Sequence, residues 1–256
     1  MIRGLLQKFR KPVRRTPAQR MLTLKTAPVY YLPITKSGST YLKNLFYYLD
    51  HEKEHFSGLD IHSNSDDLQR AKAGEEEVIR QSQYAFTVLR DPVDRFISLY
   101  FDKIYRDGPR NFPDVRSYLV SEIGLDLAPN LDVTAHRRNC DALIDWLALN
   151  LAHETDQPIN HHWRRQSSRL RRVNDLNITH LTLEGLSWQL PLFLDGLIPN
   201  LSQAMKAVTS HNHSIKPFKR EELLDAALSE KIETVYSQDK NLHHEASEKW
   251  QPWRKP

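Results

Sequence analysis

Residues 29–40, VYYLPITKSGST, predict a strand, a turn and the start of a helix. The first four residues, Val29–Leu32, are β-branched, aromatic and apolar, which predicts a short buried strand. Residues 33–38 interrupt this pattern, and an amphipathic helix is predicted to begin at about Ser39. The apolar positions of that helix, at i, i+3, i+4 and i+7, are Leu42, Leu45, Phe46 and Leu49.

A second unit of the same kind follows. Tyr84–Leu89 is predicted to be a strand that ends at Arg90, while Asp91 can cap a helix and Pro92 suits its first turn. One face of this helix carries Val93, Phe96, Ile97, Tyr100, Phe101 and Ile104. The order strand, helix, strand, helix is that of a βαβ unit, so we expect an α/β fold with a central, mostly parallel sheet flanked by helices.

The rest of the chain extends this pattern with weaker signals. A short helix is predicted over Asp66–Gly74, and residues 107–133, rich in Pro and Asp, are expected to be irregular. A helix is predicted near residues 135–152, a strand over Thr179–Leu183, and a helical C-terminal third.

The chain is expected to form one domain preceded by an arm. Its 256 residues are enough for a single well-buried core. Residues 1–26 are basic and predict a loosely ordered arm, which leaves residues 27–256 as a single domain. With 39% hydrophobic and 27% charged residues, the composition is typical of a globular protein, and no window approaches the roughly 18 apolar residues of a membrane helix.

Charge and cysteine content indicate the kind of ligand and the compartment. The formal net charge of +4 favours an anionic ligand, although a mildly basic solvated surface explains it equally well. A single cysteine, Cys140, excludes an internal disulfide and favours a reducing, cytoplasmic location. The first twenty residues lack the apolar core of a secretion signal. Residues 2–9 could contact an anionic inner membrane surface as an amphipathic helix, but a solvated arm is the favoured interpretation.

The first candidate site is the loop Lys36-Ser37-Gly38-Ser39-Thr40. It lies between a strand and a helix, where free N–H groups and the positive end of the helix dipole bind anions. Gly38 allows close backbone approach, the hydroxyls donate hydrogen bonds, and Lys36 adds a charge. The lysine precedes the glycine, whereas a nucleotide-hydrolysing P-loop has it afterwards. An ordinary Ser/Thr helix cap beside a solvated lysine is an equally good interpretation of this segment alone.

The second candidate site comprises Arg90 and Ser98. Arg90 follows the carboxyl end of a strand, where open α/β sheets bind ligands, and its guanidinium suits phosphate. Ser98 lies eight residues later, near the edge of the apolar face of the helix. An alternative pairs Arg90 with Asp94 and leaves Ser98 semi-exposed. Since both loops should open at the same sheet edge, together they suit one ligand with two separated phosphates.

These motifs resemble those of the sulfotransferase superfamily, and in detail the Golgi-type carbohydrate sulfotransferases and their bacterial relatives. Residues 36–40 resemble the 5′-phosphosulfate loop, with Thr35 where a proline is usual. The run Arg90-Asp91-Pro92-x-x-Arg95-Phe96-x-Ser98-x-Tyr100 resembles the 3′-phosphate motif. The resemblance implies a P-loop-like three-layer fold.

Three later segments extend the resemblance to about residues 28–243. His162-Trp163-Arg164-Arg165-Gln166 is similar to the His-Trp-x-Pro-Gln segment of the chondroitin-type branch, with Arg165 in place of the proline. Leu183–Leu186 resembles the end of a later Glu-containing strand, and Tyr236-x-x-Asp239 resembles a closing Tyr-x-x-Asp motif.

The resemblance implies transfer of a sulfuryl group from 3′-phosphoadenylyl sulfate to a carbohydrate hydroxyl, without a metal. The loop at residues 36–40 would hold the phosphosulfate, Lys36 would stabilise charge, and Arg90 with Ser98 would hold the 3′-phosphate. His62 is the expected base, in competition with His51, His55, His161 and His162.

The acceptor is expected to contact a basic segment. His162, Arg164 and Arg165 are the expected acceptor-binding residues. Residues 161–172 contain five arginines, which could clamp an acidic glycan or could equally be a solvated charge run.

Two other functions remain as alternatives. A nucleotide-dependent kinase would require magnesium and a lysine after the glycine of the loop. A nucleic-acid-binding module would require aromatic residues interleaved with the arginines, and only Trp163 qualifies in the 161–172 run, so no nucleic-acid partner is expected.

Overall fold

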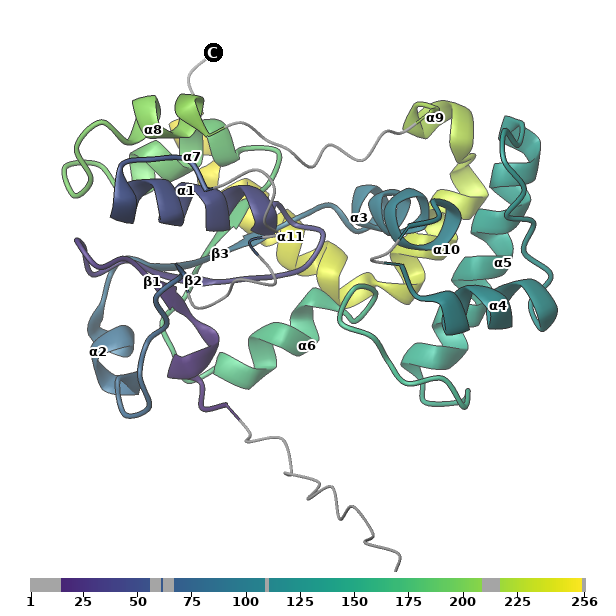
Figure 1. Cartoon of the computed structure of the whole chain (residues 1–256), viewed down its shortest axis with the longest axis horizontal. Helices are drawn as coiled ribbons and strands as arrows, with labels where there is room; N and C mark the ends of the chain where they lie inside the picture. The colour runs from purple at the N-terminus through teal and green to yellow at the C-terminus, as the bar shows by residue number, and fades with distance from the viewer. Residues whose placement is uncertain (1–14, 56–60, 62–66, 109–110, 209–216, 255–256) are drawn as a thin grey trace, which may run out of the picture.

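The protein is described by a computed structural model that covers residues 15–55, 61, 67–108, 111–208 and 217–254. Its centre is a four-stranded sheet in the order β1-β2-β3-β4 (Figure 1). The strands are β1 (Leu22–Thr23), β2 (Tyr30–Leu32), β3 (Ala85–Leu89) and β4 (Thr179–Thr182). β1 runs antiparallel to β2, and the other pairs are parallel, which confirms the expected α/β class with a mostly parallel sheet.

Helices cover both faces of this sheet. On one face, Tyr31, Phe86 and Leu181 pack against α1 (Ser39–His51), α7 (Leu186–Phe193) and α8 (Leu201–Ala207). On the other face, Tyr30, Leu32 and Ala85 pack against the 3₁₀ turn η1 (Ala18–Arg20), α2 (Glu76–Gln81) and Val173 of η4 (Arg171–Val173). η4 continues α6 (Gln166–Leu170), which lies below the sheet in Figure 1. The molecule therefore has the three layers that the family resemblance implies.

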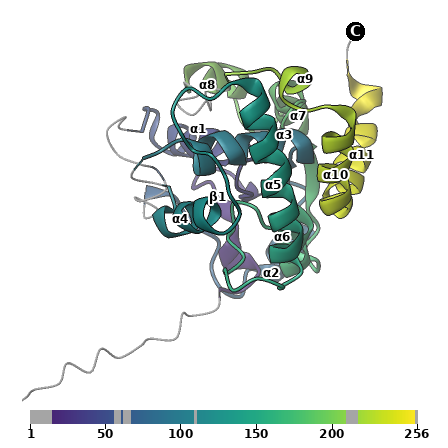
Figure 2. The same cartoon turned by 90° about the vertical axis from the view of Figure 1, so that its right-hand side faces the viewer.

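A helical cluster lies beyond the carboxyl ends of the parallel strands (Figures 1 and 2). Its helices are α3 (Pro92–Leu99), the π-helix η3 (Tyr100–Tyr105), α4 (Pro113–Ser121), α5 (Val133–Leu151), α9 (Arg220–Leu223) and α10 (Ala226–Val235). Their apolar residues form one core that includes the buried indoles of Trp146 and Trp163. α11 (Ser237–Trp250) runs back along β3 and β4 and ends in η5 (Gln251–Trp253). This cluster places residues from distant segments beside the sheet edge.

Most of the predicted elements are present, but two predictions are wrong. Residues 68–74 are not helical, since Arg70 forms a β-bridge to Leu22 and Gly74 has a positive φ of 91°. The helix forms later, as α2. Glu76 and Glu77 in its first turn stabilise it by a favourable interaction with the helix dipole. The segment 107–133 contains α4, because Pro113 suits a first turn and the helix buries Leu119 in the helical core.

The start of the packed chain also differs from the expected arm. Ala18 and Met21 are fully buried, and Leu22 pairs with Tyr31 in the sheet. Apolar side chains at these positions outweigh the basic character of the segment as a whole. Residues 1–14 lie outside the described residues, and they include segment 2–9, for which membrane contact is the alternative to a solvated arm. The assignment of residues 27–256 to one domain stays a prediction.

In the described part of the chain, no helix is both long enough and apolar enough to cross a membrane.

Candidate active site at the carboxyl edge of the sheet

The loop between β2 and α1 presents backbone N–H groups at the sheet edge. Gly38 is the N-cap of α1 with a φ of 73°, in the left-handed region that favours glycine. A Cβ at this position would lie 2.7 Å from Cδ1 of Leu183, at the end of β4. Since the capping residue has no side chain, the alternative of a Ser/Thr cap is wrong, and an anion can approach the first turn of α1 directly.

Lys36 is held inside this loop rather than solvated. Its side chain is 10% exposed, and Nζ lies 2.6 Å from Oδ2 of Asp102 in η3. Burial lowers the pKa of Lys36 to about 8, against the opposing effect of the Asp102 carboxylate. The ammonium is therefore mainly protonated at neutral pH and lies in a partly desolvated site, where its interaction with an anion is stronger than in water.

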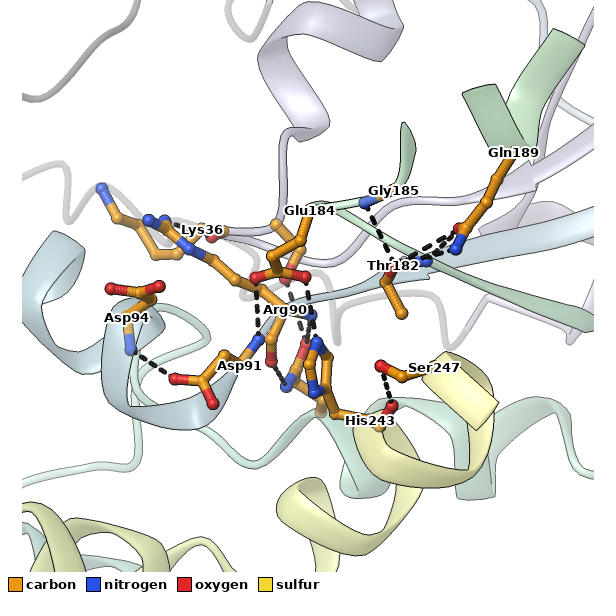
Figure 3. Close-up of polar contacts among 12 residues, drawn as sticks. Lys36, Arg90, Asp91, Asp94, Thr182, Glu184, Gly185, Gln189, His243 and Ser247 are labelled. Carbon is orange, nitrogen blue, oxygen red and sulfur yellow. Dashed lines mark hydrogen bonds and ion pairs between the residues drawn. The ribbon is translucent and has the colours of Figure 1, made fainter. Parts of the chain in front are cut away.

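Arg90 joins the second loop to the first. Its Nη1 donates to the carbonyl oxygen of Lys36 at 3.0 Å, so the loops that follow β2 and β3 open at the same edge of the sheet. Figure 3 shows the Arg90 side chain extending toward Lys36 beside the carboxylate of Glu184. Ser98, on α3, is 4% exposed, so the alternative of a semi-exposed serine is wrong. Its contact with a ligand stays a prediction.

Gln166 connects the two loops through its buried side-chain amide. Oε1 accepts from Oγ of Ser37 and from the backbone N–H of Arg90, both at 3.1 Å. Nε2 donates to the carbonyl of Arg90 at 2.9 Å. This amide, which is 1% exposed, thus fixes the loop that contains Ser37 relative to the loop that contains Arg90. In the sequence, Gln166 is only the last residue of the His162–Gln166 motif, and nothing local indicates this role.

Two further motif residues, Asp239 and Arg95, stabilise this arrangement. The carboxylate of Asp239 is fully buried and accepts the backbone N–H groups of Gln166 at 2.7 Å and Ser167 at 2.9 Å. The buried guanidinium of Arg95 donates to the carbonyls of Thr35, His162 and Arg164. These residues hold the loops together through backbone groups, and sequence spacing alone could not distinguish that task from ligand binding.

A polar network lies on the other side of Arg90 (Figure 3). Glu184 accepts from the backbone N–H of Asp91 at 3.2 Å and from Nε2 of His243 at 2.9 Å. Burial alone would raise the pKa of Glu184, but the hydrogen bond from His243 and the backbone N–H groups hold it below its usual value. Asp91 in turn accepts from Arg220 at 3.0 Å. Arg90 therefore lies between a cationic loop and an ionised carboxylate.

The structure narrows the choice of base among the candidate histidines. His62 lies outside the described residues. His51 ends α1, about 18 Å along the helix axis from its first turn, which is too far for a proton transfer at the loop. His55 lies beyond it and contacts Asp67 at 3.3 Å. Both are therefore excluded as the base.

The two remaining candidates, His161 and His162, are poor proton acceptors. Burial, followed by the positive charges of His161, Lys103 and Lys36, lowers the pKa of His162 to about 3. Burial and the charges of nearby arginines and lysines also lower the pKa of His161. Nδ1 of His162 lies 2.9 Å from Oδ1 of Asn160, so its ring is held as a neutral hydrogen-bonding group.

The expected acceptor-binding residues lie close to the loop. Arg164 and Arg165 line a cavity of about 340 Å³, together with Thr35 and Ser39 from the two ends of the loop. His162 is not among the lining residues of this cavity, whereas its neighbour His161 is. The structure thus brings the arginines, but not His162, to a ligand-sized space.

Replacement of Asp239 with Ala is expected to lower the free energy of unfolding by about 3–5 kcal/mol, because two buried N–H groups lose a charged acceptor. Urea unfolding measures the change. Asp195→Ala, at an exposed position, is the matched control and should change stability by less than about 0.5 kcal/mol. Equal effects of the two variants would contradict the role given to Asp239.

Comparison with known protein families gives one match. Residues 19–184 match the model of the sulfotransferase family, a range that includes the loops after β2 and β3, Gln166 and Glu184. No curated protein and no solved structure gives a significant match. Since the family match covers more than half of the 256 residues, the chain belongs to the sulfotransferase family.

Proposed function

We propose that the protein transfers a sulfuryl group from 3′-phosphoadenylyl sulfate to a hydroxyl group of a carbohydrate acceptor in the cytoplasm. The observation that carries the proposal is the 3.0 Å hydrogen bond from Arg90 to the carbonyl of Lys36. This contact lies where the loops that follow β2 and β3 meet at one edge of the sheet, and Gln166 also links them there, so that a nucleotide with two separated phosphates could bind both loops. Family membership independently supports sulfuryl transfer.

The residues of the first loop suit the phosphosulfate end of this donor. Gly38 leaves the first turn of α1 open, and its position against Leu183 leaves no room for a side chain. An oxyanion there would receive backbone N–H groups, hydroxyls of Ser39 and Thr40, and the charge of Lys36. Ser37 contributes through its bond to Gln166, which fixes the loop. The donor supplies the sulfuryl group and a good leaving phosphate.

Lys36 has a specific task in this proposal. As the S–O bond to the donor phosphate breaks, negative charge develops on the leaving oxygen, and a buried ammonium stabilises it without reorganisation of solvent. The ion pair with Asp102 holds Lys36 beside its loop before the donor arrives. No metal ion is part of the proposal.

Arg90 and Ser98 are assigned to the 3′-phosphate. The guanidinium of Arg90 already donates to one backbone oxygen, and its planar fork leaves further N–H groups for phosphate. Burial lowers the pKa of Arg90, while Asp94 and Glu184 oppose this shift. These carboxylates stabilise the cation before a phosphate binds.

Thermal shift measurements distinguish this function from the two alternatives. Adenosine 3′,5′-bisphosphate at 100 times its dissociation constant should stabilise the protein by about 2.7 kcal/mol, which raises the melting temperature by several degrees. ATP with magnesium and a short oligonucleotide should have much smaller effects. Stabilisation by ATP with magnesium alone would support a kinase instead, and stabilisation by the oligonucleotide alone would support a nucleic-acid-binding protein.

His62 remains the proposed base, because among the competing candidates His51 and His55 are remote from the loop, and burial lowers the pKa of both His161 and His162. It would take the proton of the acceptor hydroxyl as the new S–O bond forms. His62→Ala should reduce transfer of labelled sulfate by at least about 100-fold and leave bisphosphate binding unchanged. His51→Ala, remote from the loop, is the control. Full activity of His62→Ala would refute the assignment.

A further inference from the structure

A cationic cavity lies beside the first loop and is separate from the residues assigned to the donor's 3′-phosphate. Its volume is about 340 Å³, and six arginines, a lysine and a histidine contribute to its lining. No carboxylate occurs among its described lining residues. The arginines come from segments far apart in the sequence, including Arg70 at the β-bridge to Leu22 and Arg169 on α6. The fold, rather than one basic run, creates this charge.

The five arginines of residues 161–172 therefore divide into two groups. Arg164, Arg165 and Arg169 are half-buried and line the cavity, whereas Arg171 and Arg172 are exposed. A solvated charge run would place all five guanidiniums in water, where each has little effect on its neighbours. That interpretation is wrong for the first three arginines.

The charges at this cavity repel one another. Burial and the positive charges of Arg20, Arg172, Arg70 and Arg15 lower the pKa of Arg169 to about 10. The pKa of Arg70 is also lowered, by burial and by Arg15. Within the described ranges, no ion pair involves Arg70, Arg164 or Arg169. Such a concentration of like charge destabilises the unliganded protein, and an oxyanion would relieve it.

The cavity also adjoins the proposed site of reaction. Thr35 and Ser39, which lie on either side of the segment Lys36–Gly38, are part of its lining. Arg95 fixes this side of the loop through the carbonyl of Thr35. A group bound in the cavity is therefore next to the loop assigned to the phosphosulfate. If that group is part of an acceptor, the hydroxyls of the same acceptor molecule can reach the loop.

We propose that this cavity binds an anionic group of the acceptor, a carboxylate, sulfate ester or phosphate ester, and so selects acidic over neutral carbohydrates. This inference rests on the proposed function. Guanidinium groups bind oxyanions of all three kinds through paired N–H donors. A nucleic-acid strand fits less well, since no Phe, Tyr or Trp occurs among the described lining residues to stack with bases.

Isothermal titration with inorganic pyrophosphate tests the cavity on the full chain. The protein is first saturated with adenosine 3′,5′-bisphosphate, so that both donor subsites are filled. We expect one further equivalent of pyrophosphate to bind, with at least tenfold lower affinity in Arg169→Gln. Arg138→Gln removes the same charge at an exposed position on α5 and should bind within twofold of the unsubstituted protein.

Each outcome of this titration has a separate meaning. Equal affinity in Arg169→Gln, or no pyrophosphate binding to the saturated protein, would overturn the cavity proposal and leave the donor site intact. If the bisphosphate itself does not bind, the proposed function fails instead.

Stability and competition measurements identify what the cavity binds. Since Arg169 repels its neighbours, the unliganded Arg169→Gln variant should have the same melting temperature as the unsubstituted protein, or a higher one. A lower melting temperature would indicate a structural role for Arg169 and contradict the proposal. Pyrophosphate should be displaced by glucuronate, glucose 6-sulfate and glucose 6-phosphate, but not by glucose. The strongest competitor identifies the anionic group that the cavity prefers. Displacement by an oligonucleotide but by none of these sugars would contradict an acceptor site.

Discussion

The active-site edge depends on the buried side-chain amide of Gln166. It accepts hydrogen bonds from Ser37 and from the N–H of Arg90, and it donates one to the carbonyl of Arg90. Because Gln166 is itself held by Asp239 through its backbone, the C-terminal helix α11 contributes to the geometry of loops that follow β2 and β3. The two loops are preformed, so the proposed ligand with two phosphates would lose little conformational entropy on ordering them.

Charge is arranged differently in the two regions of the site. At the proposed donor site, each cation has a nearby carboxylate, with Asp102 beside Lys36 and Glu184 beside Arg90. In the cationic cavity, the described lining contains no carboxylate. The first arrangement stabilises the unliganded site, whereas the second leaves an unbalanced charge, which we propose that the acceptor neutralises. This difference assigns a separate task to each region within the proposed reaction.

The sequence predicts the parts of the site whose signals are local. A strand, a turn with Gly38 and an amphipathic helix are adjacent in the chain, and so are β3, Arg90 and α3. The connection made by Gln166 could not be predicted, because it joins segments up to 129 residues apart. For the same reason, spacing could not show which arginines of residues 161–172 face a cavity. The inclusion of residues 18–24 in the arm and the irregular segment at residues 107–133 were wrong, because burial of Met21 and Leu119 depends on tertiary packing.

In the proposed reaction, the two loops bind opposite ends of one nucleotide. Titrations of Arg90→Ala with adenosine 3′,5′-bisphosphate, adenosine 3′-monophosphate and adenosine 5′-monophosphate test this arrangement directly. If Arg90 binds the 3′-phosphate, the variant should lose about tenfold or more of its affinity for the first two nucleotides, through loss of charge-assisted hydrogen bonds, and almost none for the third. An equal loss for all three nucleotides, or a loss confined to the 5′-monophosphate, would contradict the account.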